Sequence, residues 1–486
     1  MSFNKSAGVV GREFARDARA VPQIGFVGGA VISSDRGPIE TTITSQDQFI
    51  SRYGKPTSDN PSKFSVMRFL RTASQITVRR VITDSTEAEA TVGGTSPDNV
   101  VTIKAENPGT WGNNISVKFN ENTDSGGSPT GLWTIEVSFN SEIVETFTVS
   151  FEVDAVDGFG NTQYIEDVIN SRSIFIYVEH DPSVTNDITD GDTGDLTGGT
   201  DDTTPVSSTE VVAGLGDFRN KEEIDLDYLI NAGWTDGAVH AEMVSVVEQR
   251  KDAVAILDAP NVTVASDLVD FRNNDSNVNS TFAALYAGWL KILDSFSGKE
   301  MFIPPSGDVA GIFASNQQIL PWLAPAGLRR GVINGVIGTN KVWSEAERDI
   351  LYPAGLNPIQ TFPGQGTVVW GQKTQSAIAN SLDRVNVRFL FNFIRETAVE
   401  ALQPFVFQAN TQFTRNSIFS LLDNFMSNIR ANDGVFDYQI VVDRSNNTDF
   451  VIENNQLEVD ILIQPVRTAE FIRVDTISVP LSQDLS

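Results

Sequence analysis

Apolar and polar residues alternate in three runs near the end of the chain, and alternation with a period of two is typical of half-buried β-strands. The runs cover residues 435–443, 457–463 and 470–479, and Pro465 ends the second run. One face of the first run carries four apolar side chains, Phe436, Tyr438, Ile440 and Val442. We predict a small sheet of three strands with open edges. An open edge either accepts a strand from another chain or is kept apart by charges and loops.

Two longer stretches alternate between strand and helix periods, which predicts a mainly parallel sheet with helices on both faces. The first has a continuous apolar run at residues 24–32, helices at 45–53 and 64–72, and a strand at 76–82. The second resumes after residue 204, and its elements are expected at 226–233, 239–250, 253–257, 280–290 and 302–303.

Between these stretches, residues 89–200 are rich in Gly, Ser, Thr, Asn and Asp. Their alternating runs are short and lie at 100–105, 115–119, 133–139, 143–151 and 174–178. Short strands punctuated by Gly and Pro favour a β-sandwich or a barrel. We interpret the region as a domain inserted into a loop of the α/β domain, which is tolerated when the ends of the insertion lie close together.

The segment before the terminal sheet is predicted to be helical. Apolar residues follow helical spacing over 382–402, as far as Pro404, and again over 418–429, after the candidate N-cap Thr411. The expected fold class is α/β and α+β multidomain, with a mainly parallel-sheet α/β core, an inserted β-sandwich-like domain and a small C-terminal α+β domain. The expected division is an N-terminal arm (1–20), the core (21–88 and 204–375), the inserted domain (89–203), the C-terminal domain (376–467) and a C-terminal arm (468–486).

Composition narrows the classes of partner. The 486 residues are enough for two or more domains, and a hydrophobic content of 40% is ordinary for a soluble protein. The chain has 63 acidic and 35 basic residues, a net charge of −28, which argues against direct nucleic-acid binding because phosphate recognition needs a basic surface. High net charge suits a protein that stays soluble at high concentration before it assembles.

Two further features of the composition concern disulfides and membranes. The absence of cysteine excludes disulfides and thiolate metal sites. No apolar run approaches ~18 residues, and the N-terminus has no hydrophobic core of a signal peptide, so we expect neither membrane insertion nor Sec export.

Familiar catalytic and metal motifs do not appear in the sequence. The Gly-Lys pairs at 54–55 and 298–299 are not followed by Ser or Thr, as a phosphate-binding loop requires, and there is no Gly-x-Ser-x-Gly elbow. The two histidines, His180 and His240, do not form a His-based zinc motif. Seven aspartates between residues 181 and 202 lack the spacing of an EF-hand, so we interpret them as a solvated acidic loop, with a cation site as the alternative. We assign no catalytic residue, metal or cofactor.

Several motifs, in their order along the chain, resemble the contractile phage tail sheath family. They are ALYAGWLK (284–291), PPSGDVAG (304–311), WLAPAG (322–327), FPGQG (362–366), WGQKT (370–374), YQIVVD (438–443) and VDILIQP (459–465). The inserted region is the least specific part of the match. The chain departs from the family pattern at three places. Ala7 stands where the family has proline, Gln-Lys at 372–373 where the family has Ala-Arg, and Phe-Gln-Ala-Asn at 407–410 where the family has Phe-Glu-Pro-Asn.

The resemblance implies a structural protein rather than an enzyme. Subunits of this family form a helical tube around an inner tail tube protein and shorten without nucleotide hydrolysis, by rigid-body rearrangement. The expected partners are further copies of the chain, the inner tube protein, and baseplate and tail terminator proteins. The expected location is the virion tail, with assembly in the host cytoplasm. The alternative interpretation is an α/β hydrolase-like enzyme with an accessory β domain, which would run as a small oligomer rather than as rods or rings.

In the family's arrangement, terminal arms add strands to the sheets of neighbouring subunits. We expect such arms here, although a frayed terminus is the alternative for the first 20 residues. Each sheet would be completed by Val9 and Val10 from one neighbour and by Phe471, Ile472 and Val474 from another.

A local charge contrast suggests where the tube is contacted. Residues 381–430 contain five arginines and four acidic residues, a net +1 within a chain of −28. The arginines are either ordinary helix-face charges or, in part, exposed partners of the tube whose weak ion pairs can break during contraction. The candidate tube-facing residues are Arg384, Arg388, Arg415 and Arg430.

Overall fold

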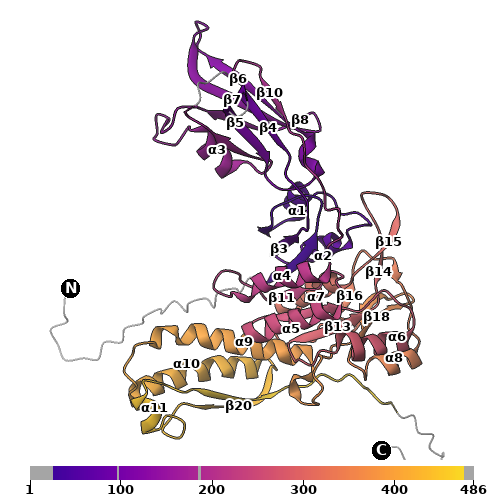
Figure 1. The fold of residues 1–486 in the computed structure, drawn as a ribbon. Helices are drawn as coiled ribbons and strands as arrows, with labels where there is room; N and C mark the ends of the chain where they lie inside the picture. Colours follow the sequence, from indigo (N-terminus) through magenta and orange to yellow (C-terminus); the bar gives the residue numbers. More distant parts are fainter. Residues whose placement is uncertain (1–25, 96–97, 184–187, 475–486) are drawn as a thin grey trace, which may run out of the picture.

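The computed structural model describes residues 26–95, 98–183 and 188–474. These residues form an elongated molecule with three parts in a row (Figure 1). A β-rich part lies at one end, an α/β core occupies the middle, and two long helices with a small sheet lie at the other end.

The core is built on a sheet of nine strands. From edge to edge they are β16 (Val332–Ile333), β19 (Gly366–Val369), β18 (Leu356–Phe362), β13 (Ala283–Ala287), β12 (Val254–Asp258), β11 (Tyr228–Ile230), β1 (Val27–Ser33), β3 (Gln75–Val81) and β2 (Glu40–Ile43). All pairs from β18 to β3 are parallel, and the pairs β2–β3, β18–β19 and β16–β19 are antiparallel. The prediction of a mainly parallel sheet is confirmed.

Both faces of this sheet are buried. Successive side chains of a strand point to opposite sides, so each strand contributes to both faces. Ala30 and Ile32 of β1 pack with α2 (Pro61–Phe69) and α7 (Ser306–Gln317). Val31 packs on the other face with α4 (Ser208–Gly216) and α5 (Gly237–Arg250). Helices therefore cover both faces, as the alternating pattern predicted.

Smaller elements complete the core. They are α1 (Gln46–Tyr53), α6 (Ala265–Asp270), α8 (Glu345–Leu351) and a sheet of β15 (Glu300–Ile303), β14 (Leu290–Leu293) and β17 (Gly338–Thr339). Residues 280–290, expected as one element, contribute to two different sheets. Gly288 separates them with φ +123°, and a Cβ on it would lie 3.1 Å from the Ile359 carbonyl oxygen, so glycine lets the chain turn there.

The inserted part has a core of its own, formed by buried residues between Ala88 and Leu196. One of its sheets contains β10 (Thr193–Asp195), β6 (Ile115–Thr123), β7 (Pro129–Phe139) and β8 (Glu142–Val149). The other contains β4 (Glu89–Thr95), β5 (Asp98–Ala105) and β9 (Ile176–His180), and α3 (Ile165–Arg172) packs beside β9. Side chains of both sheets meet in this core, which is the arrangement of a sandwich.

The third part contains α9 (Val385–Leu402), α10 (Gln412–Ala431), α11 (Asp449–Glu453) and a two-stranded antiparallel sheet of β20 (Val435–Val441) and β21 (Asp460–Pro465). Thr411 caps α10 by accepting a hydrogen bond from the backbone N–H of Thr414, as predicted. Leu390 and Ile394 of α9 pack against Ile418 and Leu422 of α10.

Two details of the terminal sheet differ from the prediction. The third strand, expected at 470–479, is absent over residues 470–474, and 475–479 lie outside the described residues. Phe436, expected to share a face with Ile440, is 68% exposed, whereas Val435 is buried. The register shifts between Val435 and Asp437, and such a bulge reverses which side chains face the core.

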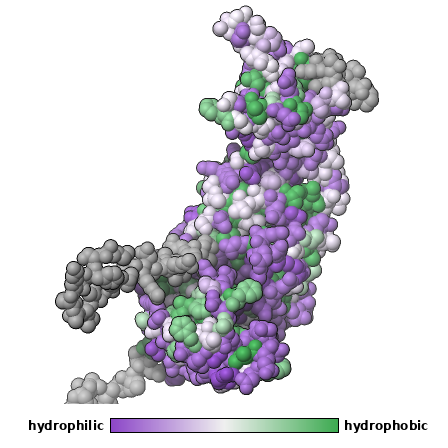
Figure 2. Space-filling view, turned by 90° about the vertical axis from the view of Figure 1, so that its left-hand side faces the viewer, coloured by the Kyte–Doolittle hydropathy of each residue, from purple (hydrophilic) through white to green (hydrophobic). Residues whose placement is uncertain are grey.

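The surface agrees with the high net charge. Figure 2 shows hydrophobic residues in separate patches on a mostly hydrophilic face. None of the helices that the structure describes is long and apolar enough to cross a membrane.

Candidate functional site

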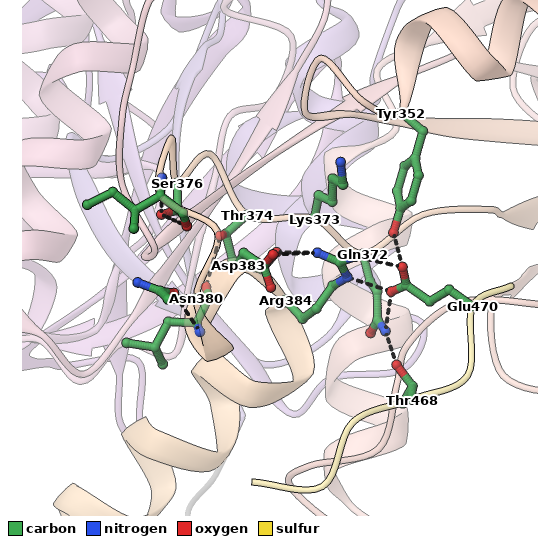
Figure 3. A network of polar contacts seen from close by, with 12 residues as sticks. Tyr352, Gln372, Lys373, Thr374, Ser376, Asn380, Asp383, Arg384, Thr468 and Glu470 are labelled. Carbon is green, nitrogen blue, oxygen red and sulfur yellow. Dashed lines mark hydrogen bonds and ion pairs between the residues drawn. The ribbon is translucent and has the colours of Figure 1, made fainter. Parts of the chain in front are cut away.

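The segment that follows β21 is held against the core at one point. Residues 466–474 have no regular secondary structure, and Glu470 accepts hydrogen bonds from three distant parts of the chain (Figure 3). Tyr352 follows α8, Gln372 follows β19, and Arg384 immediately precedes α9. We call Glu470 and these three partners the clasp.

The clasp places four hydrogen bonds on one carboxylate. Arg384 donates from Nε at 2.7 Å and from Nη2 at 2.9 Å. The Gln372 amide and the Tyr352 hydroxyl each donate at 3.0 Å. Gln372 also donates to the hydroxyl of Thr468 at 2.7 Å, so the segment is fixed at two residues. A bidentate arginine–carboxylate pair is the strongest contact of this group.

The electrostatics agree with an ionised carboxylate. Burial alone would raise the pKa of Glu470, but the hydrogen bonds from Arg384 and Gln372 outweigh it and hold that pKa below its ordinary value. The ammonium of Lys373 lies 4.9 Å from the ring centroid of Tyr352 and adds positive charge nearby. Gln372 and Lys373, one of the places at which the sequence departs from the sheath pattern, both belong to this region.

Beyond the clasp, the segment presents apolar side chains to solvent. Phe471, Ile472 and Val474 are each at least 80% exposed. A hollow of about 300 Å³ lies between this segment and the start of α9. Large apolar side chains that are exposed next to one another are typical of an interaction surface. Val9 and Val10, the other predicted arm residues, lie outside the described residues.

The four candidate tube-facing arginines have different environments. Arg384 belongs to the clasp. Arg388 is buried, and its guanidinium lies 4.2 Å from the ring centroid of Phe282. Arg415 is also buried and donates to the side chain of Asn410. The expectation of exposure is therefore wrong for Arg388 and Arg415, which pack inside the subunit. Arg430 has a half-exposed side chain over the ring of Tyr438.

Sequence reasoning missed the clasp. It placed Arg384 toward the tube, but this arginine pairs with a carboxylate 86 positions later. No periodicity connects two residues so far apart. The available signal was the charge of Glu470, the first residue of the alternating run 470–479. A carboxylate in that position needs a partner.

Ser306 and the two histidines make hydrogen bonds within the fold. The buried hydroxyl of Ser306 donates to Asp258 at 2.6 Å. His180 contacts the hydroxyl of Tyr164, and His240 contacts that of Ser276. Among the described residues, no group of three or more His, Asp or Glu could hold a metal ion.

Comparisons with known proteins identify the family. A family model for the phage tail sheath protein central domain matches residues 206–375, and one for the phage tail sheath C-terminal domain matches 379–477; together they span more than half of the chain. The tail sheath protein of Vibrio phage KVP40 is 35% identical over 211 residues, which are 43% of this chain and 31% of that protein. The tail sheath protein of Enterobacteria phage T4 is 27% identical over 379 residues, which are 72% of this chain and 56% of that protein.

A solved structure shares the fold. The helical sheath of the anti-feeding prophage in its contracted state matches with a TM-score of 0.57 and 16% identity, covering 98% of this chain and 99% of that one. The chain spans about a third to just over half of the length of the two phage relatives. By its two matched domains and these relatives, the chain belongs to the phage tail sheath family.

Proposed function

We propose that the chain is a structural subunit of a contractile tail sheath. Copies polymerise helically around an inner tube protein, and the helical tube shortens to drive the inner tube through a target envelope. The relatives are tail sheath proteins, and the similar structure is a helical sheath in a contracted state. Contraction in this proposal is a rigid-body rearrangement between two packings, with no catalytic step and no cofactor.

The observation that carries the proposal is the exposed apolar segment held by the clasp. A segment that is fixed at Glu470 and then offers Phe471, Ile472 and Val474 to solvent is suited to donate a strand. The sheet of β20 and β21 has only two strands among the described residues, so its edges can accept one. Val9 and Val10 of one neighbour and the C-terminal segment of another would complete it.

The binding free energy expected for such arms is enough to keep neighbouring subunits connected during contraction. Each large apolar side chain that becomes buried contributes ~1.5–3 kcal/mol. A few per arm can keep subunits connected while they rotate. The tube, baseplate and tail terminator proteins are the further partners, and the virion tail is the location, with assembly in the host cytoplasm.

Deletion of residues 1–15 tests the arm. We expect a folded and soluble monomer that forms no sheath, while the full chain forms rods or large rings in negative stain and elutes from a sizing column accordingly. A deletion variant that still forms normal sheath would overturn the arm proposal. A full chain that remains a small oligomer would favour the hydrolase-like alternative.

A further inference from the structure

We propose that a basic hollow on the core binds an acidic side chain of a second copy of this chain. The hollow has a volume of about 270 Å³ and lies between α2, α7 and the loop before β16. Three arginines line it, Arg68, Arg71 and Arg330, together with Asp308. The inference rests on the proposed assembly, because it assigns a contact between copies.

One of the arginines is already neutralised. Arg68 donates from Nε to both carboxylate oxygens of Asp308, at 2.9 and 2.8 Å, and from Nη2 to Oδ1 at 2.5 Å. Both side chains are about 10% exposed or less. Arg68 also donates to the carbonyls of Asn334 and Gly335. Arg68 and Asp308 therefore form a floor of the hollow that carries no net charge.

The other two arginines supply the charge. Arg71 is exposed and makes one long hydrogen bond of 3.3 Å to the carbonyl of Asn334. Within the described part of the chain, neither Arg71 nor Arg330 forms an ion pair with a carboxylate. Thr72 and Ser315 add hydroxyls to the lining. Arginines that line a partly enclosed space and form no ion pair among the described residues can bind a carboxylate, in bidentate fashion where a guanidinium faces it.

The charge of the chain indicates the partner. A subunit with a net charge of −28 repels its own copies, so close packing favours contacts that place a carboxylate of one copy on a cation of the next. Only 35 of the 486 residues are basic, and two of them line this hollow without an ion pair of their own among the described residues. A carboxylate-bearing segment of a second copy is therefore the occupant that the observations favour.

Charge reversal in the hollow tests the proposal. The double variant Arg71→Glu with Arg330→Glu is compared with Lys118→Glu with Arg172→Glu, which makes the same change of net charge at exposed residues of the inserted part. Self-association is measured by sedimentation over a range of salt. We expect the hollow variant to need about tenfold more protein to associate, the change that ~1.4 kcal/mol produces, and the control to stay close to the wild type.

The salt dependence and a conservative variant separate the explanations. Salt screens both the general repulsion between copies and the contact in the hollow, so the difference in association between the wild type and the hollow variant should narrow as salt rises. Arg71→Lys with Arg330→Lys keeps the charge and should restore most of the association. Equal association of the hollow variant and the control would overturn the inference. If millimolar inorganic phosphate weakens the self-association of the wild type more than sodium chloride does, the hollow is an anion site. If phosphate weakens the association of the wild type and of the hollow variant equally, the result counts against the inference.

The outcome is distinguishable from the proposed function. A wild type that associates through the hollow but forms no tubes would contradict the sheath proposal and keep the inference. Tubes that form equally well in the hollow variant would keep the sheath proposal and overturn the inference.

Discussion

At the scale of single residues, the clasp makes a testable link between one carboxylate and the C-terminal segment. Glu470→Gln removes the charge that Arg384 and Gln372 stabilise. The attachment of the segment to the core should lose about 1–3 kcal/mol of free energy, because the charged donor Arg384 loses its charged partner. We expect hydrogen exchange over residues 466–474 to become faster at neutral pH. Limited trypsin digestion after Arg467 should accelerate as well.

The clasp also predicts a pH dependence. The pKa of Glu470 lies below its ordinary value of 4.5 in the folded chain, so its stabilisation is fully present above 4.5 and is lost as the pH falls through the folded value. The protection factors over 466–474 in the wild type, which correct for slower intrinsic exchange at low pH, should fall on acidification and approach those of Glu470→Gln. The exposed Glu453→Gln is the matched control, and a similar effect of both variants would remove the role of the clasp.

A second carboxylate acts in the opposite direction. Glu396 lies on α9, and burial first, then the neighbouring Asp227 and Asp252, raise its pKa to about 8. Its Oε1 has no hydrogen-bond partner within the described residues. The unfolded chain ionises this group above about 4.5, whereas the folded chain keeps its proton until about 8, so the residue lowers stability progressively between these pH values.

Glu396→Gln should therefore stabilise the protein in a pH-dependent way. We expect little difference from the wild type near pH 4.5 and a gain of about 1–3 kcal/mol at pH 8 and above, since the ionised carboxylate is buried with its Oε1 unpartnered among the described residues and glutamine carries no charge. Urea unfolding at several pH values measures it. Glu400→Gln, on the exposed side of the same helix, is the control, and a gain that does not depend on pH would contradict the explanation.

At the scale of elements, the sequence predicted what local patterns control and missed what long-range contacts control. The parallel strands and the helices α9 and α10 follow from period and caps, as Thr411 illustrates. The bulge between Val435 and Asp437 has no signature in the alternation, so Phe436 was assigned to the wrong face. Residues 470–474 alternate like a strand, but the clasp fixes them outside any sheet of the subunit.

The helical segment also shows why charge counts mislead. Five arginines suggested an exposed basic face, yet Arg388 stacks on Phe282 and Arg415 caps a loop at Asn410. A long guanidinium side chain can bury its stem and satisfy its donors inside a subunit. Composition alone cannot distinguish this from exposure.

The tube hypothesis now depends mainly on Arg430. It is half exposed and 3.5 Å from Asp437, so it can exchange this weak pair for one with another protein. Arg430→Glu should reduce the formation of extended sheath on tubes and leave tube-free polymerisation intact. The loss per subunit should be small, because each exposed ion pair contributes only ~0.2–1 kcal/mol. Electron microscopy with and without purified tube measures both. Equal loss in the two assays would mean that Arg430 serves the fold or contacts between sheath subunits.

At the scale of the whole molecule, the inserted part is attached to the core by a polar joint. The Asp202 carboxylate accepts backbone hydrogen bonds from Thr83 and Ser85 at 3.0 and 2.8 Å. Asp84 in turn accepts from the backbone of Thr203 at 2.8 Å. These contacts hold the two connecting segments side by side, and the inserted part extends from one end of the molecule (Figure 1). We infer that it lies at the outer radius of the sheath, where it does not obstruct packing.

Excision of the inserted part tests both its boundary and its position. One variant replaces residues 89–203, the predicted boundary, with a short Gly-Ser bridge. A second replaces 87–199 and keeps Asp202, because Thr86 and Thr200 pair through backbone hydrogen bonds of 3.1 and 3.2 Å and a short bridge can join them. The first variant loses the cap of residues 83–85 and should be the less stable, by about 1–2 kcal/mol.

Both excision variants should fold, since the removed region has its own core and the remaining sheet keeps all nine strands. Both should also polymerise into tubes with a smaller outer diameter, which negative stain measures. Unfolding of both variants would place the boundary elsewhere. Folded variants that fail to polymerise would mean that the inserted part contacts neighbouring subunits, because arms and core would then be present and insufficient for assembly.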